Sequence, residues 1–63
     1  MSKETLTNVR NELIEIIDRL DSLMDSNTLS DKENVDVLKG RDYIYLGFVQ
    51  IKNCLKDMEK GDL

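Results

Sequence analysis

Residues 6–24, LTNVRNELIEIIDRLDSLM, carry the most regular apolar pattern of the chain. The apolar residues recur at alternating steps of three and four, a spacing that places them along one side of an α-helix. No glycine or proline interrupts the run, so a first helix is predicted from about residue 3 to residue 25. Its line of apolar side chains, which we call the first seam, consists of Leu6, Val9, Leu13, Ile16, Leu20 and Leu23.

The first seam occupies heptad positions a and d when Leu6 is placed at a. Ile17 and Met24 then fall at position e and widen the apolar stripe, whereas Ile14 falls at b and lies outside it. A stripe of this width has to be covered by another element, because apolar surface left in water costs free energy. The cover must come from the short remainder of the chain or from another molecule.

A turn is predicted at residues 26–30, SNTLS, because short polar side chains compete with the helical backbone for hydrogen bonds. Ser30 is followed three residues later by Glu33, which fits the capping box of a helix N-terminus. A second helix is therefore predicted from residue 31 to about residue 60.

The second helix has its own apolar line, which is clearest toward its C-terminal end. Apolar residues recur there at steps of four and three. Extended backwards, the line reaches Arg41, Val37 and Asn34, so polar residues interrupt its first half. This second seam consists of Ile44, Phe48, Ile51, Leu55 and Met58.

Two alternatives to a continuous second helix stay open. Gly40 and Gly47 each cost a helix about 1 kcal/mol relative to alanine, and a break at Gly40 would give three helices in place of two. Residues 35–51 are also rich in aromatic and β-branched residues, which suits a β-hairpin. The helix is favoured because two strands alone are marginal in water and the helical spacing continues through Leu55 and Met58.

The fold class predicted for residues 1–63 is therefore all-α, a single antiparallel helical hairpin. A chain of 63 residues is marginally stable alone, and small folds usually add a disulfide, a metal or another subunit. One cysteine and no histidine exclude an intramolecular disulfide and the common zinc ligand sets. We therefore expect a homodimer in which two hairpins form a four-helix bundle.

The charge balance is acidic, with thirteen acidic and nine basic residues and a formal net charge of −4. Such a chain is repelled on average by duplex DNA and by anionic membranes. The longest uncharged run, residues 43–51, is too short to span a bilayer. A lone thiol and no signal peptide indicate a cytoplasmic protein.

The sequence offers no residue set for catalysis, cofactor binding or metal binding, so we do not expect an enzyme. Cys54 has no histidine to act as its base, and Gly40 and Gly47 do not form a Gly-rich phosphate loop. The carboxylate pairs of the first helix fall on its polar face, where they stay hydrated. These pairs are Glu12 with Glu15 and Asp18 with Asp21.

Residues 43–51 carry more apolar side chains than the second seam requires. Four of them project away from the seam in the heptad frame, and so many exposed apolar residues in a short stretch indicate a binding patch. Either a second copy of the chain or another protein would cover them, and tyrosines are typical anchors of protein interfaces. The candidate partner-binding residues are Tyr43, Tyr45, Leu46 and Val49.

These features favour a small non-enzymatic adaptor, inhibitor or regulator that presents an apolar helix face to a protein partner. The alternative is an RNA-binding hairpin dimer of regulatory type. In length and helix pattern the plan is similar to that of Rop-type plasmid copy-number regulators, which are also short helical hairpins that dimerise. RNA binding needs a basic or aromatic face, for which the first helix offers Lys3 and Arg10.

Overall fold

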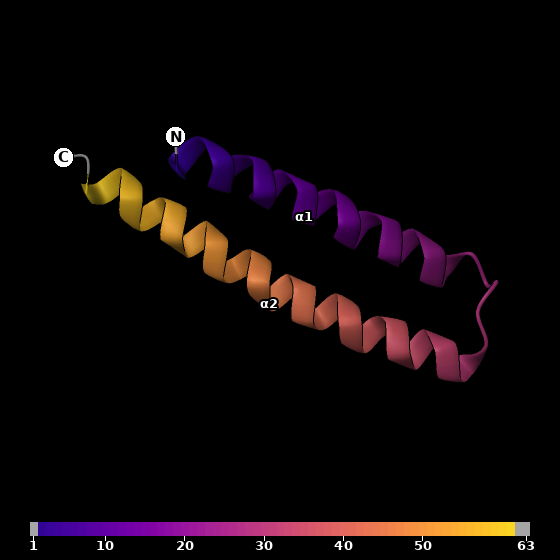
Figure 1. Cartoon of the computed structure of the whole chain (residues 1–63). Helices are drawn as coiled ribbons and strands as arrows, with labels where there is room; N and C mark the ends of the chain where they lie inside the picture. Colours follow the sequence, from indigo (N-terminus) through magenta and orange to yellow (C-terminus); the bar gives the residue numbers. More distant parts are fainter. Residues whose placement is uncertain (1, 62–63) are drawn as a thin grey trace.

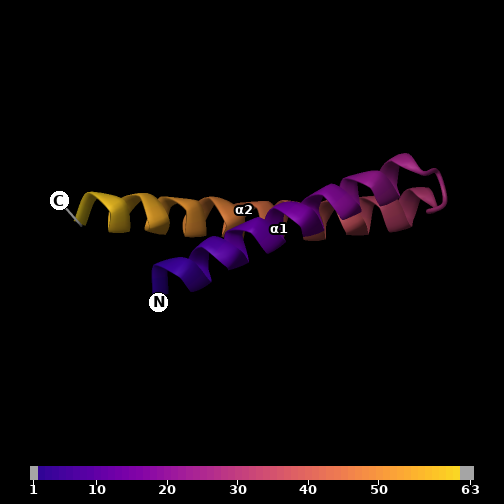
Figure 2. The same cartoon turned by 90° about the horizontal axis from the view of Figure 1, so that it is seen from above.

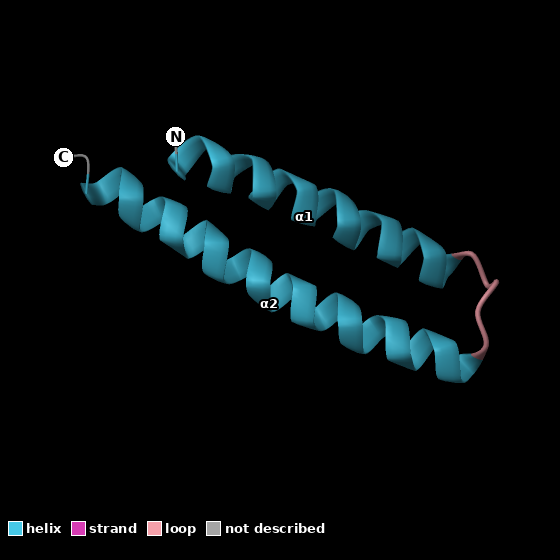
Figure 3. Ribbon diagram, viewed as in Figure 1, coloured by secondary structure: helices cyan, strands magenta, loops and turns pink. Residues whose placement is uncertain are grey.

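The structure is a computed structural model that describes residues 2–61. Within this range the chain forms two helices and no strand, with α1 spanning Ser2–Asp25 and α2 spanning Asp31–Gly61. The helices lie antiparallel and are joined by one short loop, so the start of α1 and the end of α2 lie at the same end of the molecule (Figure 1; Figure 3). The predicted all-α helical hairpin is confirmed.

α2 continues without a break through Gly40 and Gly47, and residues 35–51 are helical throughout. The three-helix variant is not observed, and the β-hairpin alternative is wrong. The second seam explains the continuity, because Ile44 and Ile51 flank Gly47 on the side of α2 that is partly buried. Packing along this line outweighs the low helix propensity of the glycines.

Residues of the turn determine where α1 ends and where α2 begins. The backbone N–H of Ser30 donates to Glu33 Oε1 at 2.8 Å, and the backbone N–H of Glu33 donates to Ser30 Oγ at 3.2 Å. The predicted capping box is therefore confirmed. α1 ends just before Asn27, whose φ of 60° lies in the left-handed region that asparagine tolerates better than most residues.

The contact between the helices follows a line of α1 that differs from the first seam. Among residues 2–61, only Ile17 and Leu55 are buried, with exposed fractions of 7% and 4%. Ile17 is at heptad position e, so α1 faces α2 through positions a and e. Two d residues, Ile16 and Leu23, are each 39% exposed and lie beside the contact. On α2 the buried line is the second seam itself.

Ion pairs near both ends of the hairpin show its register. Near the turn, Arg41 Nε lies 3.0 Å from Asp21 Oδ1. At the open end, Lys3 Nζ lies 4.0 Å from Glu59 Oε1. In both pairs the residue numbers add up to 62, so a residue of α1 lies level with the α2 residue whose number is about 62 minus its own.

The hairpin is a rod of 49 × 15 × 13 Å, and its two helices cross when the molecule is seen from above (Figure 2). Its Cα radius of gyration is 14.7 Å, whereas a compact domain of this length is expected near about 11 Å. A rod of two helices contains a single helix–helix contact. Most of the surface of each helix therefore stays in water.

Replacement of Leu55 by alanine tests the position of the core. Leu55 is 4% exposed, so Leu55→Ala is expected to lower the free energy of unfolding by about 2–5 kcal/mol. Leu46 is 61% exposed, and Leu46→Ala is expected to stay within about 0.5 kcal/mol of the unmodified chain. Urea unfolding followed by circular dichroism at one protein concentration gives both values. Equal losses would contradict the burial of Leu55.

A pH titration tests the capping box. The backbone N–H of Ser30, and then its hydroxyl, hold the pKa of Glu33 below its ordinary value of 4.5. Ionised Glu33 therefore stabilises the fold above pH 4.5, and this contribution is lost as the pH falls through the lowered pKa. Glu33→Gln keeps the capping geometry without a titrating charge.

The melting temperature of the unmodified chain is expected to exceed that of Glu33→Gln near neutral pH, and the difference is expected to shrink below pH 4.5. Differential scanning calorimetry of both chains across this range gives the difference directly. A difference that does not change with pH means that the charge of Glu33 plays no part in the cap.

Candidate protein-interaction site

The reactive side chains of residues 2–61 do not gather into a metal site. No group of three or more histidine, cysteine, aspartate or glutamate side chains in this range is placed to hold a metal ion. Cys54 is a free and exposed thiol, and Glu12, Glu15 and Asp18 are exposed. The main feature of this surface is instead its exposed apolar area.

Large apolar side chains remain exposed on both helices. Each residue turns an α-helix by about 100°, so residues two positions apart point in nearly opposite directions. Ile14 and Ile16 therefore lie on opposite sides of the line through the buried Ile17. The exposed large apolar residues are Ile14, Ile16, Leu23, Val35, Leu38, Tyr43, Tyr45 and Leu46.

One side of the hairpin, which we call the tyrosine face, is built mainly by α2. Its α2 residues recur at helical spacing and form a second apolar line beside the second seam. Tyr45 is 45% exposed, and Ile14 of α1 joins the same side because both residues line one hollow. The tyrosine face consists of Ile14, Val35, Leu38, Tyr45 and Val49.

The hollow in the tyrosine face has a volume of about 180 Å³ and lies where α1 and α2 meet. Pockets for drug-sized ligands measure roughly 300–1,000 Å³, whereas a cavity of roughly 150 Å³ accommodates one benzene ring. The hollow therefore has the size for one side chain. It is lined by Ile14, Ile17, Asp18, Arg41, Tyr45 and Phe48.

Arg41 forms the polar edge of the hollow. Its Nε donates to Asp21 Oδ1 at 3.0 Å, and its Nη2 donates to Asp21 Oδ2 at 3.3 Å. These hydrogen bonds raise the pKa of Arg41, so its charge is permanent. The guanidinium carbon lies 5.5 Å from the centroid of the Tyr45 ring, and the centroids of Tyr45 and Phe48 are 6.0 Å apart. The Tyr45 ring thus has fixed neighbours on two sides.

The opposite side of the hairpin, which we call the isoleucine face, combines large residues of α1 with small residues of α2. Ile16 lies across the contact line from Ile14, and Gly47 lies across it from Tyr45. A Cβ atom built on Gly47 meets no neighbouring atom within 4 Å, so the space beside it is open. The isoleucine face consists of Val9, Ile16 and Leu23 on α1 and of Gly40, Gly47 and Cys54 on α2.

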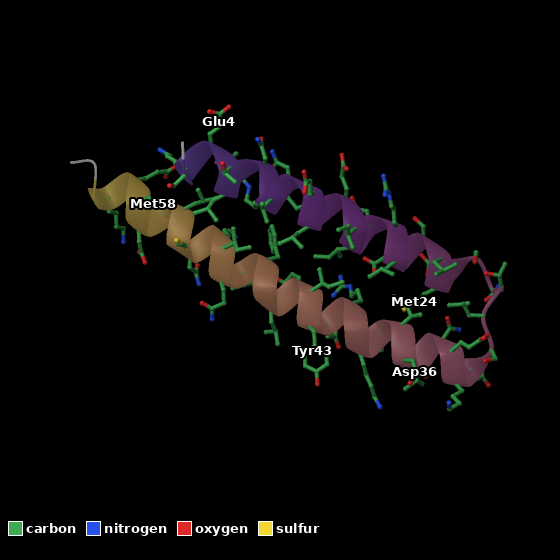
Figure 4. All side chains as sticks on the ribbon, viewed as in Figure 1. Glu4, Met24, Asp36, Tyr43 and Met58 are labelled. Atoms are coloured by element: carbon green, nitrogen blue, oxygen red, sulfur yellow. The ribbon has the colours of Figure 1, made fainter. Side chains whose placement is uncertain are left out.

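The four candidate partner-binding residues that the sequence indicates do not lie on one surface of the structure. Tyr45 and Val49 lie on the tyrosine face. Tyr43 is 76% exposed and points away from α1 (Figure 4). Leu46 is 61% exposed and lies at the outer edge of the tyrosine face. Only two of the four residues therefore share a surface with the hollow.

Sequence reasoning missed three members of the tyrosine face, which are Ile14, Val35 and Leu38. The signal for two of them is spacing, because Leu38 precedes Tyr45 by seven residues, close to two helical turns, and Val35 precedes Leu38 by three, close to one turn. No local signal marks Ile14, which joins the face only because α1 meets α2 through positions a and e. The pairing of Asp21 with Arg41 also depends on packing between the helices.

No protein-family model matches the chain, and no curated protein or solved structure is significantly similar to it. Neither helix within residues 2–61 combines the length and the apolar character that crossing a bilayer requires.

Proposed function

We propose that this chain is a cytoplasmic, non-enzymatic protein–protein interaction module, an adaptor, inhibitor or regulator that works as a dimeric four-helix bundle. The observation that carries the proposal is the presence of apolar faces on opposite sides of one two-helix hairpin. Two helices cover each other along one line only, so both faces of the isolated hairpin stay in water. An apolar surface of this kind is typical of a protein that binds other proteins.

The exposed area supports this proposal. The chain exposes 4971 Å², whereas a compact monomer of 7.3 kDa is expected to expose about 4,200 Å². The excess of roughly 800 Å² equals the area that one partner buries in a protein interface of standard size.

We assign the tyrosine face to a different protein. Its centre combines an aromatic ring, an arginine and a hollow for one side chain, and such features concentrate binding energy at protein interfaces. The pair of Arg41 and Asp21 is already formed, so less side-chain freedom is lost on binding. The apolar line from Val35 to Val49 is about 21 Å long, which suits an amphipathic helix of the partner.

RNA binding receives less support from the same geometry. Lys3 Nζ lies 4.0 Å from Glu59 Oε1, and Arg10 Nη2 donates to Asn11 Oδ1 at 3.2 Å. Each of these cations therefore has a partner within the chain, with which a phosphate would have to compete. The net charge of −4 also opposes the approach of RNA.

A capture experiment with two matched tyrosine variants tests the proposed function. The tagged chain is cross-linked in cells that naturally contain it, the captured protein is identified by mass spectrometry, and its affinity is measured with purified components. Tyr45→Ser removes one wall of the hollow and is expected to weaken binding at least about 30-fold, as for the loss of an interface hot spot. Tyr43→Ser makes the same change on the outer side of α2 and is expected to alter the affinity less than about threefold.

Equal weakening by the two variants would contradict the assignment to the tyrosine face. Failure of every captured protein to bind the purified chain would contradict the proposed function itself. A salt-sensitive mobility shift with RNA, unaffected by Tyr45→Ser, would favour the RNA-binding alternative.

A further inference from the structure

We propose that a second copy of this chain covers the isoleucine face, with the turns of the two hairpins at the same end of the bundle. This inference rests on the dimer of the proposed function and adds its contact surface and its orientation. The tyrosine face is left free by this arrangement, because it lies on the opposite side of the hairpin.

The direction of the apolar stripe on α1 points to a second neighbouring helix. Leu13 and Ile17 cover the part of the stripe that faces α2, whereas Ile16 and Leu23 cover the part beside it. In a four-helix bundle each helix has two adjacent neighbours, and its apolar stripe points between them. On α1 the d positions Val9, Ile16 and Leu23 extend the stripe on one side, whereas Ile14 lies alone on the other. The stripe therefore places the missing neighbour of α1 beside Ile16 and Leu23.

The register of the hairpin places each large residue of the isoleucine face level with a small one. In both ion pairs between the helices the residue numbers add up to 62, so residues with this sum lie at the same height along the rod. The numbers of Ile16 and Gly47 add up to 63, so these two residues also lie level. The same sum recurs at intervals of seven residues along the face. The level pairs are Val9 with Cys54, Ile16 with Gly47, and Leu23 with Gly40.

A two-fold axis parallel to the rod brings the large residues of one copy against the small residues of the other. It places α1 of one copy against α2 of the other at the same level, so Ile16 of one copy meets Gly47 of the other. The space beside Gly40 and Gly47 is open, since a Cβ atom on either glycine meets nothing within 4 Å. Each contact occurs twice, as the symmetry of a dimer requires.

The opposite orientation, with the turns at opposite ends, packs less well. It brings α1 against α1 and α2 against α2, so large residues meet large residues and glycines meet glycines. Bulky side chains would then hold the helices apart on one side and leave a void beside Gly40 and Gly47 on the other. Atoms that line a void lose their contacts, so this arrangement is less stable.

Charge alone would favour the opposite orientation. Residues 15–46 form the half of the hairpin that contains the turn, and they carry eight acidic and four basic residues. Turns at the same end place two such acidic halves side by side. Salt weakens this repulsion, since the Debye length is about 8 Å at physiological ionic strength, and the burial of the isoleucine face opposes it. The dimer is therefore expected to tighten when salt is added.

Sedimentation equilibrium with two matched isoleucine variants tests the contact surface. Ile14 and Ile16 are 40% and 39% exposed but lie on opposite faces. The unmodified chain is expected to dimerise at micromolar concentration. Ile16→Asp is expected to dimerise at least about 100-fold more weakly, because a carboxylate buried in an apolar interface is left without a partner. The dimer affinity of Ile14→Asp is expected to stay within about threefold of that of the unmodified chain. A dimer lost by Ile14→Asp and kept by Ile16→Asp overturns this face.

Gly47→Leu separates dimerisation from folding. Leucine favours the helix more than glycine does, and a Cβ atom at Gly47 meets no neighbouring atom within 4 Å in one hairpin. Helical circular dichroism is therefore expected to be kept, while the filled space excludes Ile16 of the second copy and weakens the dimer at least about tenfold. A Gly47→Leu chain that dimerises as tightly as the unmodified one overturns the proposal.

Spin labels near the turn test the orientation. Lys32→Cys is labelled in a Cys54→Ala background, which keeps a small apolar residue on the isoleucine face and is first shown by sedimentation equilibrium to dimerise like the unmodified chain. The distance between the two labels of the dimer is then measured by pulsed electron paramagnetic resonance. With rods of 49 × 15 × 13 Å, turns at the same end predict less than about 30 Å, and turns at opposite ends predict more than about 40 Å. The longer distance overturns the orientation. An unmodified chain that remains a folded monomer overturns the dimer in the proposed function as well, whereas the capture experiment reports on the tyrosine face separately.

Discussion

The apolar stripe of α1 is wider than one neighbouring helix can cover, and this mismatch governs the rest of the molecule. α2 buries Ile17 and shields the a positions, yet it leaves Ile16 and Leu23 each 39% exposed. Burial of apolar area is the dominant favourable term in the folding of a small domain. This chain has 63 residues, and its described part contains two buried side chains. The hairpin alone therefore gains little free energy from the burial of apolar area. The remaining part of the stripe is therefore a source of binding energy for another helix.

The two sides of the hairpin differ in chemistry, which suits a division of roles between them. The isoleucine face is apolar and carries bulk on one helix and open space on the other, so it is complementary to itself. The tyrosine face carries an ordered charge pair, a half-exposed aromatic ring and a hollow beside them. Polar groups at fixed positions select a partner by chemistry, because a mismatched partner leaves them unpaired. We therefore propose that the chain self-associates through the isoleucine face and recognises a different protein through the tyrosine face.

Sequence reasoning succeeded where the deciding interactions are local. The capping box joins Ser30 and Glu33 within one helical turn, and the apolar residues of each helix recur every three or four positions, so both can be read from neighbouring positions. The side of α1 that faces α2 could not be read in this way. Positions a, d and e are all apolar in the middle of α1, and the choice of e over d at Ile17 depends on how α2 packs.

The candidate site shows the same division. Tyr45 and Val49 were indicated by the apolar surplus of their own stretch. Ile14 and Asp21 belong to the site only through contacts between residues 20 or more positions apart, such as the bond from Arg41 to Asp21. Spacing alone also did not separate Tyr43 from Tyr45, because the direction of the contact with α1 decides which tyrosine lies beside the hollow.

Methyl exposure at Ile14 and Ile16 shows whether another molecule covers the isoleucine face in solution. The two side chains are almost equally exposed in the hairpin, at 40% and 39%, so any difference between them in solution comes from another molecule. Relaxation of their methyl signals by a soluble paramagnetic agent can be compared in the purified chain by nuclear magnetic resonance. If a second copy of the chain covers the isoleucine face, Ile16 is protected and Ile14 is not. Equal relaxation of both methyl groups in a folded chain would contradict this arrangement.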